Sequence, residues 1–507
     1  MEFLKLTQTS KSLLVLNVLL SLVYFACIAF VFPAGNVPLF ILLVISEIFH
    51  VWQVFGFVHT IWGRRRDKKF DARFRPRVAV FITVCGEPAD IIEKTVIAAK
   101  ALKYPYFKIY ILNDGKVAGR DNWQEAESIA RLYDVECITR EVPGGAKAGN
   151  INNAMTLTKQ PYIVVFDADH EPKPTFLQET IGYFVDEKVA FVQSPQYYHN
   201  ASLNQVSGGA WEQQALFFGP LLKGKDTVNA TFMCGTNMVV RRVALEEVGG
   251  MSEKSIAEDF LTSLLIHEKK WKSVYVDKVL AAGLAPEDFL SYYKQQFRWA
   301  RGSLEILFAY NPLLRRGLTW AQKMQYLASS GYYLSGVIVL INALLPLTYF
   351  FLALKPLTIN TMTLALIFLP YIFIIVYTLQ LSSNFTYTFR ALSFSLGSST
   401  IYMKALWATL LRRQDAFAVT SKTRIGGNHG KLVLPHLGYI ALVIVGVAWG
   451  VTREGWSPSM ISNIAWAIIY IAAFAPFIAA AFERAPASTP VKKTSVIDTP
   501  SNSEVQL

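Results

Sequence analysis

The sequence has few charged residues for its length. Only 17% of its 507 residues are Asp, Glu, Lys or Arg, whereas 52% are hydrophobic and the mean hydropathy is +0.31. These values exclude an ordinary soluble enzyme of this size, so part of the chain must lie in lipid. The apolar residues gather in long uncharged runs towards both ends, and the middle has a globular composition. The sequence therefore predicts a soluble domain flanked by membrane segments.

Cysteine and acidic residues are also scarce. Cys27, Cys85, Cys137 and Cys234 show neither paired nor metal-type spacing, which excludes a disulfide framework and a zinc site. A reducing, cytosol-facing domain fits this usage. The 49 Lys and Arg exceed the 37 Asp and Glu, for a net charge of +12. Because basic residues cluster beside apolar runs, as in 64–69, we expect a membrane anchor and no nucleic-acid partner.

Six apolar runs reach the length of about 20 residues that a helix needs to cross a bilayer. The first lacks a small-residue cleavage signature, so we interpret it as a retained helix. The links richest in positive charge are expected inside, which places both termini and the 64–325 segment in the cytoplasm of a multi-pass bacterial inner (plasma) membrane protein. The predicted spans are Leu13–Phe32, Pro38–Trp62, Tyr326–Leu354, Leu364–Leu381, Leu434–Thr452 and Met460–Phe482.

Between the second and third spans, short β-rich runs alternate with helical patterns. This alternation predicts an α/β domain with a mostly parallel sheet, whose ligands bind at the carboxyl ends of strands. Pro286–Leu307 and Phe394–Leu411, rich in aromatic and cationic residues, are predicted to lie on the membrane surface. The alternating segments are Val78–Thr83, Ala89–Leu102, Lys108–Leu112, Trp123–Tyr133 and Tyr162–Phe166.

These patterns divide the chain into four parts. Residues 1–69 form a membrane domain with two helices, and residues 70–285 form the cytosolic α/β domain. Residues 286–484 hold the surface helices, four further membrane helices and a basic loop at about 412–430. Residues 485–507 are polar, contain Pro and Ser, and are predicted to be disordered.

Asp167 and Asp169 end an apolar strand run, where a sheet gives way to a loop. Two carboxylates at this spacing can hold one divalent cation such as Mg²⁺, which is commonly shared with substrate phosphates. The alternative is a pair of solvated loop carboxylates, because Asp-x-Asp alone is frequent in loops.

Two further acidic sites each have a structural alternative. Asp114 follows the strand run Tyr110–Leu112 and precedes Gly115, so it lies at a strand end or in a plain Asx turn. Glu258 and Asp259 begin a periodic segment, where acids also stabilise the first turn of a helix through the helix dipole.

A fourth motif lies just before the chain enters the membrane. Gln295, Arg298 and Trp299 fall within two helical turns. Arginine can neutralise phosphate, and a bulky aromatic side chain can stack on a sugar face. An interfacial anchor is the alternative, since Trp and Arg both favour the headgroup region.

In this order the four motifs resemble the D, D, D, QxxRW signature of processive family 2 glycosyltransferases, the group of cellulose, chitin and hyaluronan synthases. The resemblance spans most of the chain. Thr83–Pro88 resembles the nucleotide-contacting opening of that fold, and Lys147–Asn150 resembles its Lys-x-Gly-Asn element. The implied fold is a cytosolic GT-A-type domain with a Rossmann-like mixed sheet, inserted in an all-α transmembrane domain of about six helices.

The resemblance also implies an activity and roles for individual residues. The activity is inverting transfer from a UDP-sugar with Mg²⁺ or Mn²⁺ as cofactor, Asp259 and Glu258 being catalytic, with Asp259 as general base, and Asp167 and Asp169 holding the metal. The implied donor-binding residues are Thr83, Glu87, Asp114, Lys147, Asp167, Gln295 and Arg298, and the implied acceptor-binding residues are Trp299, Cys234 and Gly235.

Within the group, the segments 218–221, 224–226 and 232–237 resemble the acceptor-binding region of cellulose synthases. The segment 417–422 matches their FxVTxK gating-loop motif, which adds Phe417, Thr420 and Lys422 to the implied donor-binding residues. A mobile lid would exclude water that hydrolyses the donor. The alternative is a basic juxtamembrane loop.

The chain departs from the family pattern in three places. Asn113 stands where many members have a first Asp, and Ala257 stands where many have Thr. Bacterial cellulose synthases usually continue into a cyclic-di-GMP-binding barrel after the gating loop, whereas this sequence continues into two more spans. We therefore expect no regulation by that ligand within this sequence.

The predicted function is a processive inverting glycosyltransferase that polymerises UDP-glucose into a β-glucan and translocates it across the plasma membrane. Its expected partners are the UDP-sugar, the nascent polysaccharide and the lipid bilayer, with accessory subunits left open. The alternatives are a hyaluronan- or chitin-type synthase, a non-processive membrane transferase acting on lipid or protein, and a transporter with a binding domain. Glu47 and His50, one turn apart in the second span, either line the polymer path or pair with each other.

Overall fold

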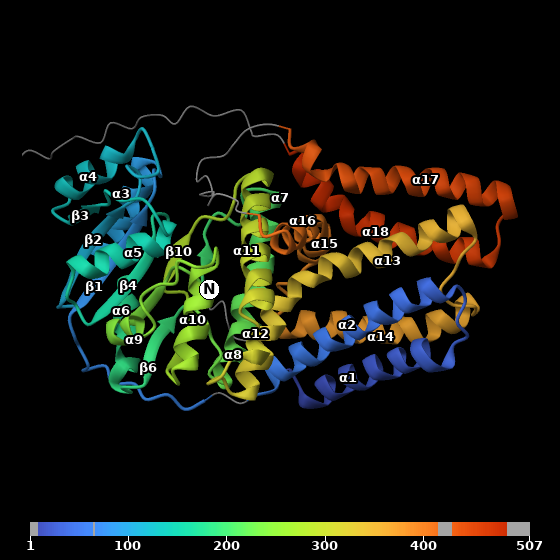
Figure 1. The fold of residues 1–507 in the computed structure, drawn as a ribbon, viewed down its shortest axis with the longest axis horizontal. Helices are drawn as coiled ribbons and strands as arrows, with labels where there is room; N and C mark the ends of the chain where they lie inside the picture. Colours follow the sequence, from blue (N-terminus) through green and yellow to red (C-terminus); the bar gives the residue numbers. More distant parts are fainter. Residues whose placement is uncertain (1–8, 64–65, 414–427, 484–507) are drawn as a thin grey trace, which may run out of the picture.

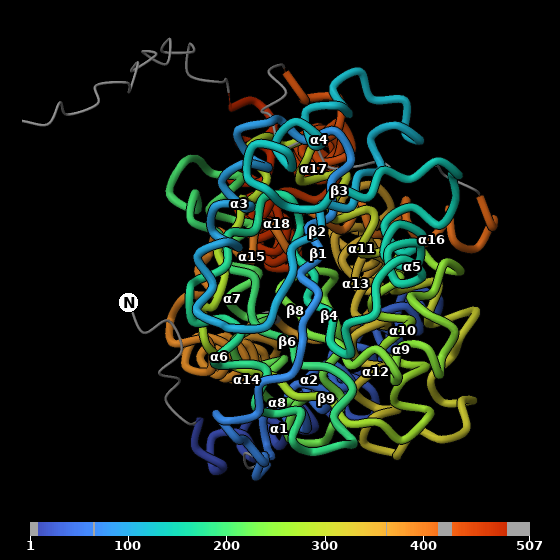
Figure 2. The backbone as a smooth tube through the Cα atoms, turned by 90° about the vertical axis from the view of Figure 1, so that its left-hand side faces the viewer, coloured from blue at the N-terminus to red at the C-terminus, as the bar shows by residue number. Residues whose placement is uncertain are grey.

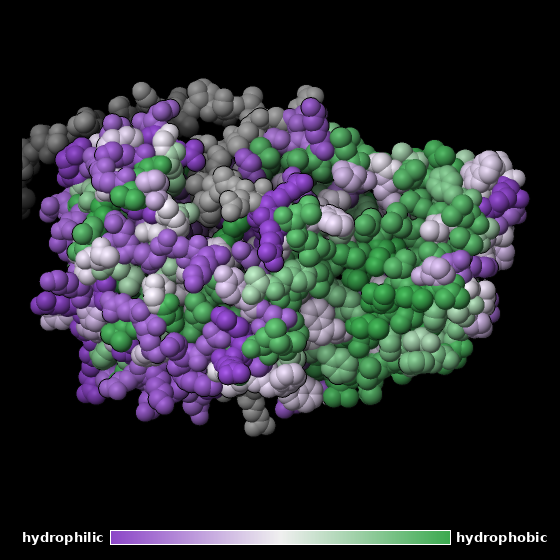
Figure 3. Space-filling view, viewed as in Figure 1, coloured by the Kyte–Doolittle hydropathy of each residue, from purple (hydrophilic) through white to green (hydrophobic). Residues whose placement is uncertain are grey.

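The computed structural model describes residues 9–63, 66–413 and 428–483. An α/β domain forms the left half of the molecule in Figure 1, and a bundle of long helices forms the right half. Figure 2 views the molecule from the side of the α/β domain, with the helical bundle behind it. On the face shown in Figure 3, hydrophilic side chains cover the α/β domain, and apolar side chains cover most of the helical bundle.

A seven-stranded sheet with the order β3-β2-β1-β4-β8-β6-β9 organises the α/β domain. Strand β8 is antiparallel to both of its neighbours, and the other adjacent strands are parallel. The predicted mostly parallel sheet is therefore confirmed. The strands are β1 Val78–Val84, β2 Phe107–Asn113, β3 Glu136–Thr139, β4 Tyr162–Asp167, β6 Val189–Gln193, β8 Met238–Arg241 and β9 Lys272–Tyr275.

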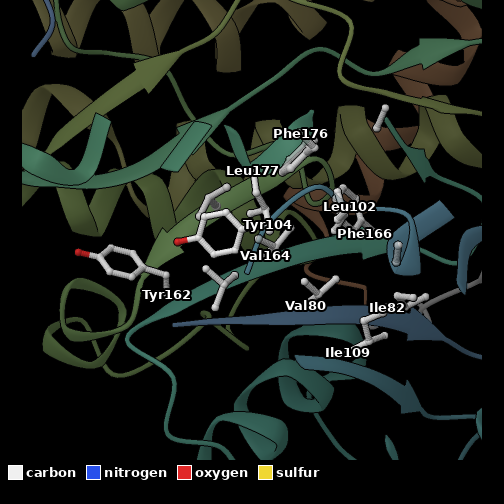
Figure 4. Packing of buried hydrophobic residues seen from close by; sticks show 14 of the residues in the cluster. Val80, Ile82, Leu102, Tyr104, Ile109, Tyr162, Val164, Phe166, Phe176 and Leu177 are labelled. Atoms are coloured by element: carbon white, nitrogen blue, oxygen red, sulfur yellow. The ribbon is translucent and has the colours of Figure 1, made fainter. Parts of the chain in front are cut away.

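Alternate strand residues pack on two buried faces of this sheet. Val80 and Ile82 face α3, α4 and α6, together with Phe176 (Figure 4). Ala79 and Phe81 face α5 and α9 on the other side. Burial on both faces requires apolar residues at nearly every position, which explains the run VAVFITV of β1. The helices are α3 Ala89–Lys100, α4 Trp123–Leu132, α5 Ala146–Leu157, α6 Phe176–Thr180 and α9 Arg242–Glu247.

The strand register brings polar side chains to one edge of the sheet. Val84 lies opposite Asn113 and Thr83 lies opposite Asp167. The strands predicted from the sequence are correct, but each ends one residue later than predicted, so Val84, Asn113 and Asp167 belong to strands. Because parallel strands share one carboxyl edge, motifs far apart in sequence meet there.

A smaller sheet and several helices complete the domain. The small sheet has the order β5-β10-β7, and α10 carries the third acidic motif at its first turn. The remaining elements are β5 Glu171–Pro172, β7 Tyr197–Tyr198, β10 Ala281–Gly283, η2 Ile181–Val185 and α10 Glu258–Glu268.

Six helices in the described residues are long and apolar enough to cross a membrane, and each overlaps one predicted span. The third is longer than predicted, since it joins three consecutive elements and runs from Trp320 to Leu352. The elements are α1 Lys11–Ala26 with η1 Cys27–Val31, α2 Val37–Trp62, α12 Trp320–Gly331 with η5 Tyr332–Leu334 and α13 Ser335–Leu352, α14 Thr361–Ser382, η6 Gly430–Val433 with α17 Leu434–Glu454, and α18 Pro458–Ala481.

Another set of helices lies where the two halves meet (Figure 1). The segment predicted as Pro286–Leu307 is a helix over Phe289–Ala309, which is α11. The segment predicted as one helix, Phe394–Leu411, is two helices that divide at Ser398. These boundary elements are α7 Gln205–Leu216, η3 Phe217–Leu221, α8 Leu222–Thr227, α11, η4 Pro312–Leu314, α15 Phe389–Gly397 and α16 Ser399–Leu410.

Candidate active site

The strand ends, α5 and the Gly235 loop converge on one charged centre. Lys147, from the first turn of α5, pairs with the Asp167 carboxylate and donates a 2.8 Å hydrogen bond to the Gly235 carbonyl. Thr83 Oγ1 donates to the same carboxylate over 3.2 Å. The Asp167 backbone N–H donates to Thr236 Oγ1 over 2.9 Å. Two side chains distant in sequence thus hold the Asp167 carboxylate, and a third holds its backbone.

Asp167, Asp169 and His170 can offer ligand atoms that lie within 4.8 Å of one another. Asp169 Oδ2 accepts a hydrogen bond from the Leu284 backbone N–H at 3.2 Å, and Oδ1 lies 3.3 Å from His170 Nδ1. His170 Nε2 is buried without a hydrogen-bond partner among the described residues. Carboxylate oxygens with one imidazole nitrogen can bind a divalent cation. His170 was missed, although it directly follows Asp169 in the sequence.

Asp114 is held by an arginine that the sequence motifs did not indicate. Arg140 donates to both carboxylate oxygens of Asp114 at 2.7 Å, and both side chains are buried. Burial raises the pKa of Asp114, and the hydrogen bonds from Arg140 oppose that rise. Arg140 also donates to the carbonyl of Gly144, just before the helix that carries Lys147, and to the carbonyl of Ala146, the first residue of that helix.

Two more polar side chains order the loops at these strand ends. Asn113 is fully buried, its Oδ1 accepting from Gly115 N at 2.9 Å and its Nδ2 donating to Trp123 O at 2.8 Å. The position that departs from the family pattern therefore shapes the turn after β2. Glu87 Oε2 accepts from the Cys85 backbone N–H at 2.6 Å, which places this predicted donor-binding residue at the neighbouring strand end.

Asp259 lies beside the charged centre at the start of α10. Gly235 has a φ of +79°, and a Cβ built on it would lie 3.2 Å from Asp259 Oδ2 and 3.6 Å from Lys147 Nζ. Enclosure raises the pKa of Asp259 to about 7; the Glu258 carboxylate adds to the rise, while Lys147 and Arg298 oppose it. The pKa of Glu258 is also raised by burial. Both acids keep partial solvent exposure.

Helix α11 brings the fourth motif to the same place. A Cβ on Gly302 would lie 2.5 Å from the Ala257 Cβ, so the small residues at both positions allow α11 to touch the start of α10. Arg298 is close enough to lower the pKa of Asp259. Burial raises the pKa of the Tyr198 hydroxyl, the charge of Asp169 adds to the rise, and Gln295 and Arg298 on α11 oppose it. This close packing joins the third and fourth motifs.

Two of the remaining predicted residues, Trp299 and Cys234, lie in the described part of the chain, and three do not. Trp299 is half-buried on α11. Burial raises the pKa of the Cys234 thiol, which keeps it protonated, and the Cys234 N–H donates to Gln193 Oε1 at 2.9 Å. Phe417, Thr420 and Lys422 lie outside the described residues.

Two ionisable residues of the second span, Glu47 and His50, are paired. His50 Nδ1 lies 3.3 Å from Glu47 Oε2. This contact is one of the two arrangements expected from the sequence.

Comparisons with known proteins agree with this arrangement. Residues 76–302 match the family described as glycosyltransferase like family 2, and residues 245–388 match the family described as cellulose synthase. A cellulose synthase catalytic subunit (UDP-forming) from Pseudomonas fluorescens is 30% identical over 453 residues, which are 85% of this chain and 60% of the relative. One from Xanthomonas axonopodis pv. citri is 36% identical over 294 residues, 56% of this chain and 40% of the relative. The chain thus spans at most about three-fifths of these relatives.

A solved structure supports the fold. A mannosyltransferase from Pyrobaculum calidifontis, in complex with GDP-mannose and Mn²⁺, superposes with a TM-score of 0.50 at 16% identity, covering 79% of this chain and all of that protein. Together with the family matches, this likeness confirms the predicted glycosyltransferase domain of GT-A type joined to apolar helices.

Proposed function

We propose, from the premise that this chain belongs to the family 2-like glycosyltransferases of the cellulose synthase type, that it polymerises a UDP-sugar at the cytoplasmic membrane face. The observation that carries the proposal is the meeting of Asp167, Lys147, Gly235 and Asp259 at one edge of the sheet. Chemistry at this edge needs a base, a cationic site for a diphosphate and ligands for a divalent cation, and all three lie there.

Asp259 is the proposed general base. Its carboxylate would take the proton of an acceptor hydroxyl while that oxygen attacks C1 of the donor sugar and the bond from C1 to the diphosphate breaks. Inversion at C1 follows from attack opposite the leaving group. A pKa of about 7 suits this role, because a large share of the base is then ionised near neutral pH and the base still binds a proton well.

Lys147 and Arg298 are the proposed cations for the departing diphosphate. Lys147 pairs with Asp167, and a donor phosphate would compete for this ammonium group. Asp167, Asp169 and His170 would hold Mg²⁺ or Mn²⁺, which supplies Lewis-acid stabilisation of the leaving phosphates. Lys147 and Arg298 would then neutralise the negative charge that develops on the diphosphate.

Asp114 is the proposed contact for the nucleobase, with Thr83 and Glu87 nearby. Arg140 occupies one lone pair on each oxygen of Asp114. A carboxylate offers about four acceptor positions, so a base N–H can still be bound. Trp299, Cys234 and Gly235 remain the proposed acceptor side, and Phe417, Thr420 and Lys422 the proposed lid.

The finer proposal is that the sugar is glucose, the product a β-glucan, and the path out the membrane helices. It is supported by the likeness to UDP-forming cellulose synthase subunits and by the position of α11, which links the site to the helical half (Figure 1). The basic residues around 64–69 favour a cytoplasmic catalytic domain in the plasma membrane.

The test is incubation of the purified protein in detergent with Mg²⁺ and single UDP-sugars, followed by digestion with linkage-specific glucanases. We expect UDP release and a long polymer from UDP-glucose alone. Polymer from another UDP-sugar would indicate a chitin- or hyaluronan-type synthase, and single-sugar products would indicate a non-processive transferase. No UDP release with any donor would refute the proposal.

A further inference from the structure

Helix α8, on the proposed acceptor side of the site, contacts two helices of the membrane half, α2 and α12. The backbone of Gly224 touches the Thr60 carbonyl of α2 so closely that a Cβ could not fit between them. The next residue, Lys225, donates from Nζ to the Gln325 carbonyl at 3.0 Å and to Gln325 Oε1 at 2.9 Å. Gln325 belongs to α12, the first part of the third apolar span.

Lys225 is an unusual residue for this position. It is only 3% exposed, and among residues 9–63, 66–413 and 428–483 no carboxylate pairs with it. Burial lowers the pKa of Lys225 to about 7. Burying a lysine without an acidic partner costs free energy, so the two hydrogen bonds to Gln325 are needed to hold the Lys225 ammonium group in its buried position.

The acceptor of these bonds belongs to a polar network between the two halves. Gln325 Oε1 also lies 2.9 Å from Thr60 Oγ1, and Gln325 Nε2 lies 2.8 Å from His59 Nδ1. One amide side chain therefore links α8 and α12 with the end of α2.

A second path of contacts runs from the same place to the proposed base. The Lys225 ammonium lies 6.0 Å from the centre of the Phe232 ring, and the Phe232 and Phe260 rings lie 4.5 Å apart. Phe260 stacks on Tyr326 at 5.3 Å. Phe260 follows Asp259 in the chain, and Tyr326 follows Gln325. The helix that anchors Lys225 thus also packs on the neighbour of the base.

We propose that Lys225 is a positioning residue that holds the acceptor wall of the cleft and the start of α10 in register with the third membrane-spanning helix. This inference rests on the proposed function, because such register matters only when a growing product passes from the site towards the membrane. A displacement of about 1 Å can reduce a rate by about a hundredfold, so a modest loosening suffices to interrupt elongation.

The experiment compares Lys225→Met with Lys223→Met in the full-length protein. Lys223 lies on the same helix but is half-buried and pairs with the carboxylate of Asp277, which makes it a matched control. For Lys225→Met we expect UDP to bind as tightly as before, while mean polymer length falls about tenfold or more, within the range that misplacement causes. UDP released per sugar incorporated rises, because donor is then hydrolysed without elongation. Lys223→Met keeps the wild-type polymer length.

A general packing defect is separated by a double variant, Lys225→Met with Gln325→Leu. Replacing both partners by apolar groups can restore stability without restoring the polar link. We expect this variant to recover melting temperature but to keep making short polymers. Wild-type length in Lys225→Met, or recovery of length together with stability in the double variant, overturns the role. A wild-type protein that makes no polymer overturns the proposed function itself.

Discussion

Asp114, on the proposed nucleotide side of the site, and Asp259, on its proposed transfer side, are both enclosed acids but have different surroundings. Both oxygens of Asp114 accept hydrogen bonds from one buried guanidinium, that of Arg140. Asp259 accepts a 2.7 Å bond from the Phe260 N–H, and its nearest charged neighbour in the chain is another acid, Glu258.

The different surroundings of the two carboxylates indicate different roles. A carboxylate fixed by a bidentate arginine keeps one orientation, which suits recognition of a constant group such as a nucleobase. A carboxylate beside a second acid in an enclosed place has a raised pKa and exchanges its proton near neutral pH. The two sides can be tested separately, since a change on one should leave the other's property intact.

The largest effect is expected from Asp259→Asn. The amide cannot accept the acceptor's proton, and loss of a general base typically costs about 10²- to 10⁴-fold in rate. Donor binding should persist, because Asp167, Lys147 and Arg298 are unchanged. Polymer synthesis is measured with radiolabelled UDP-glucose and donor affinity by calorimetry with UDP. Full synthesis by this variant would contradict the assignment of the base.

Arg140→Ala should act on the nucleotide side. Removing one partner of a buried ion pair costs about 3–5 kcal/mol, because Asp114 is left charged and unpaired. We expect a lower melting temperature and much weaker UDP binding. Lys116→Ala is the matched control, since Lys116 pairs with Glu141 at 2.7 Å on the surface, where such pairs contribute about 0–1 kcal/mol. Equal effects of the two changes would remove the distinction between the two sides.

Acidification should act on the transfer side. The pKa of Asp259 is raised to about 7, so its carboxyl group is ionised above that pH and protonated below it. Only the ionised form can take a proton, and the rate should therefore fall about tenfold for each pH unit below the pKa. The measurement is the initial rate of UDP release between pH 5 and about 8.5 at saturating donor. A flat profile over this range would be inconsistent with a base of this pKa.

Much of the fold followed from sequence patterns that depend on simple physical rules. Strands such as Val78–Val84 are buried on both faces and read as unbroken apolar runs, and the spans were found by length. The meeting of Thr83 and Asp167 could be anticipated because parallel strands share a carboxyl edge. The two-helix form of 389–410 could not, since the break at Ser398 depends on tertiary packing such as that of Gly397 against Phe477.

The site residues that were missed owe their roles to partners distant in sequence. Arg140 looks like any other arginine until the fold brings it to Asp114, and Lys225 looks like a surface lysine until α8 meets Gln325. His170 differs, because its place directly after Asp169 was a usable signal for a third ligand.

Glu258→Gln should produce the smallest change, and it separates charge from shape on the transfer side. The amide keeps the size of the side chain but removes the negative charge that helps to raise the pKa of Asp259. The acid limb of the rate profile should therefore move to lower pH. The shift should be smaller than the full difference between a pKa of about 7 and the ordinary aspartate pKa of about 3.9, because burial still raises the pKa of Asp259. Arg140→Ala, compared at equal donor saturation, should leave this limb in place. A limb that stays fixed in Glu258→Gln would show that enclosure alone sets the proton affinity of the base.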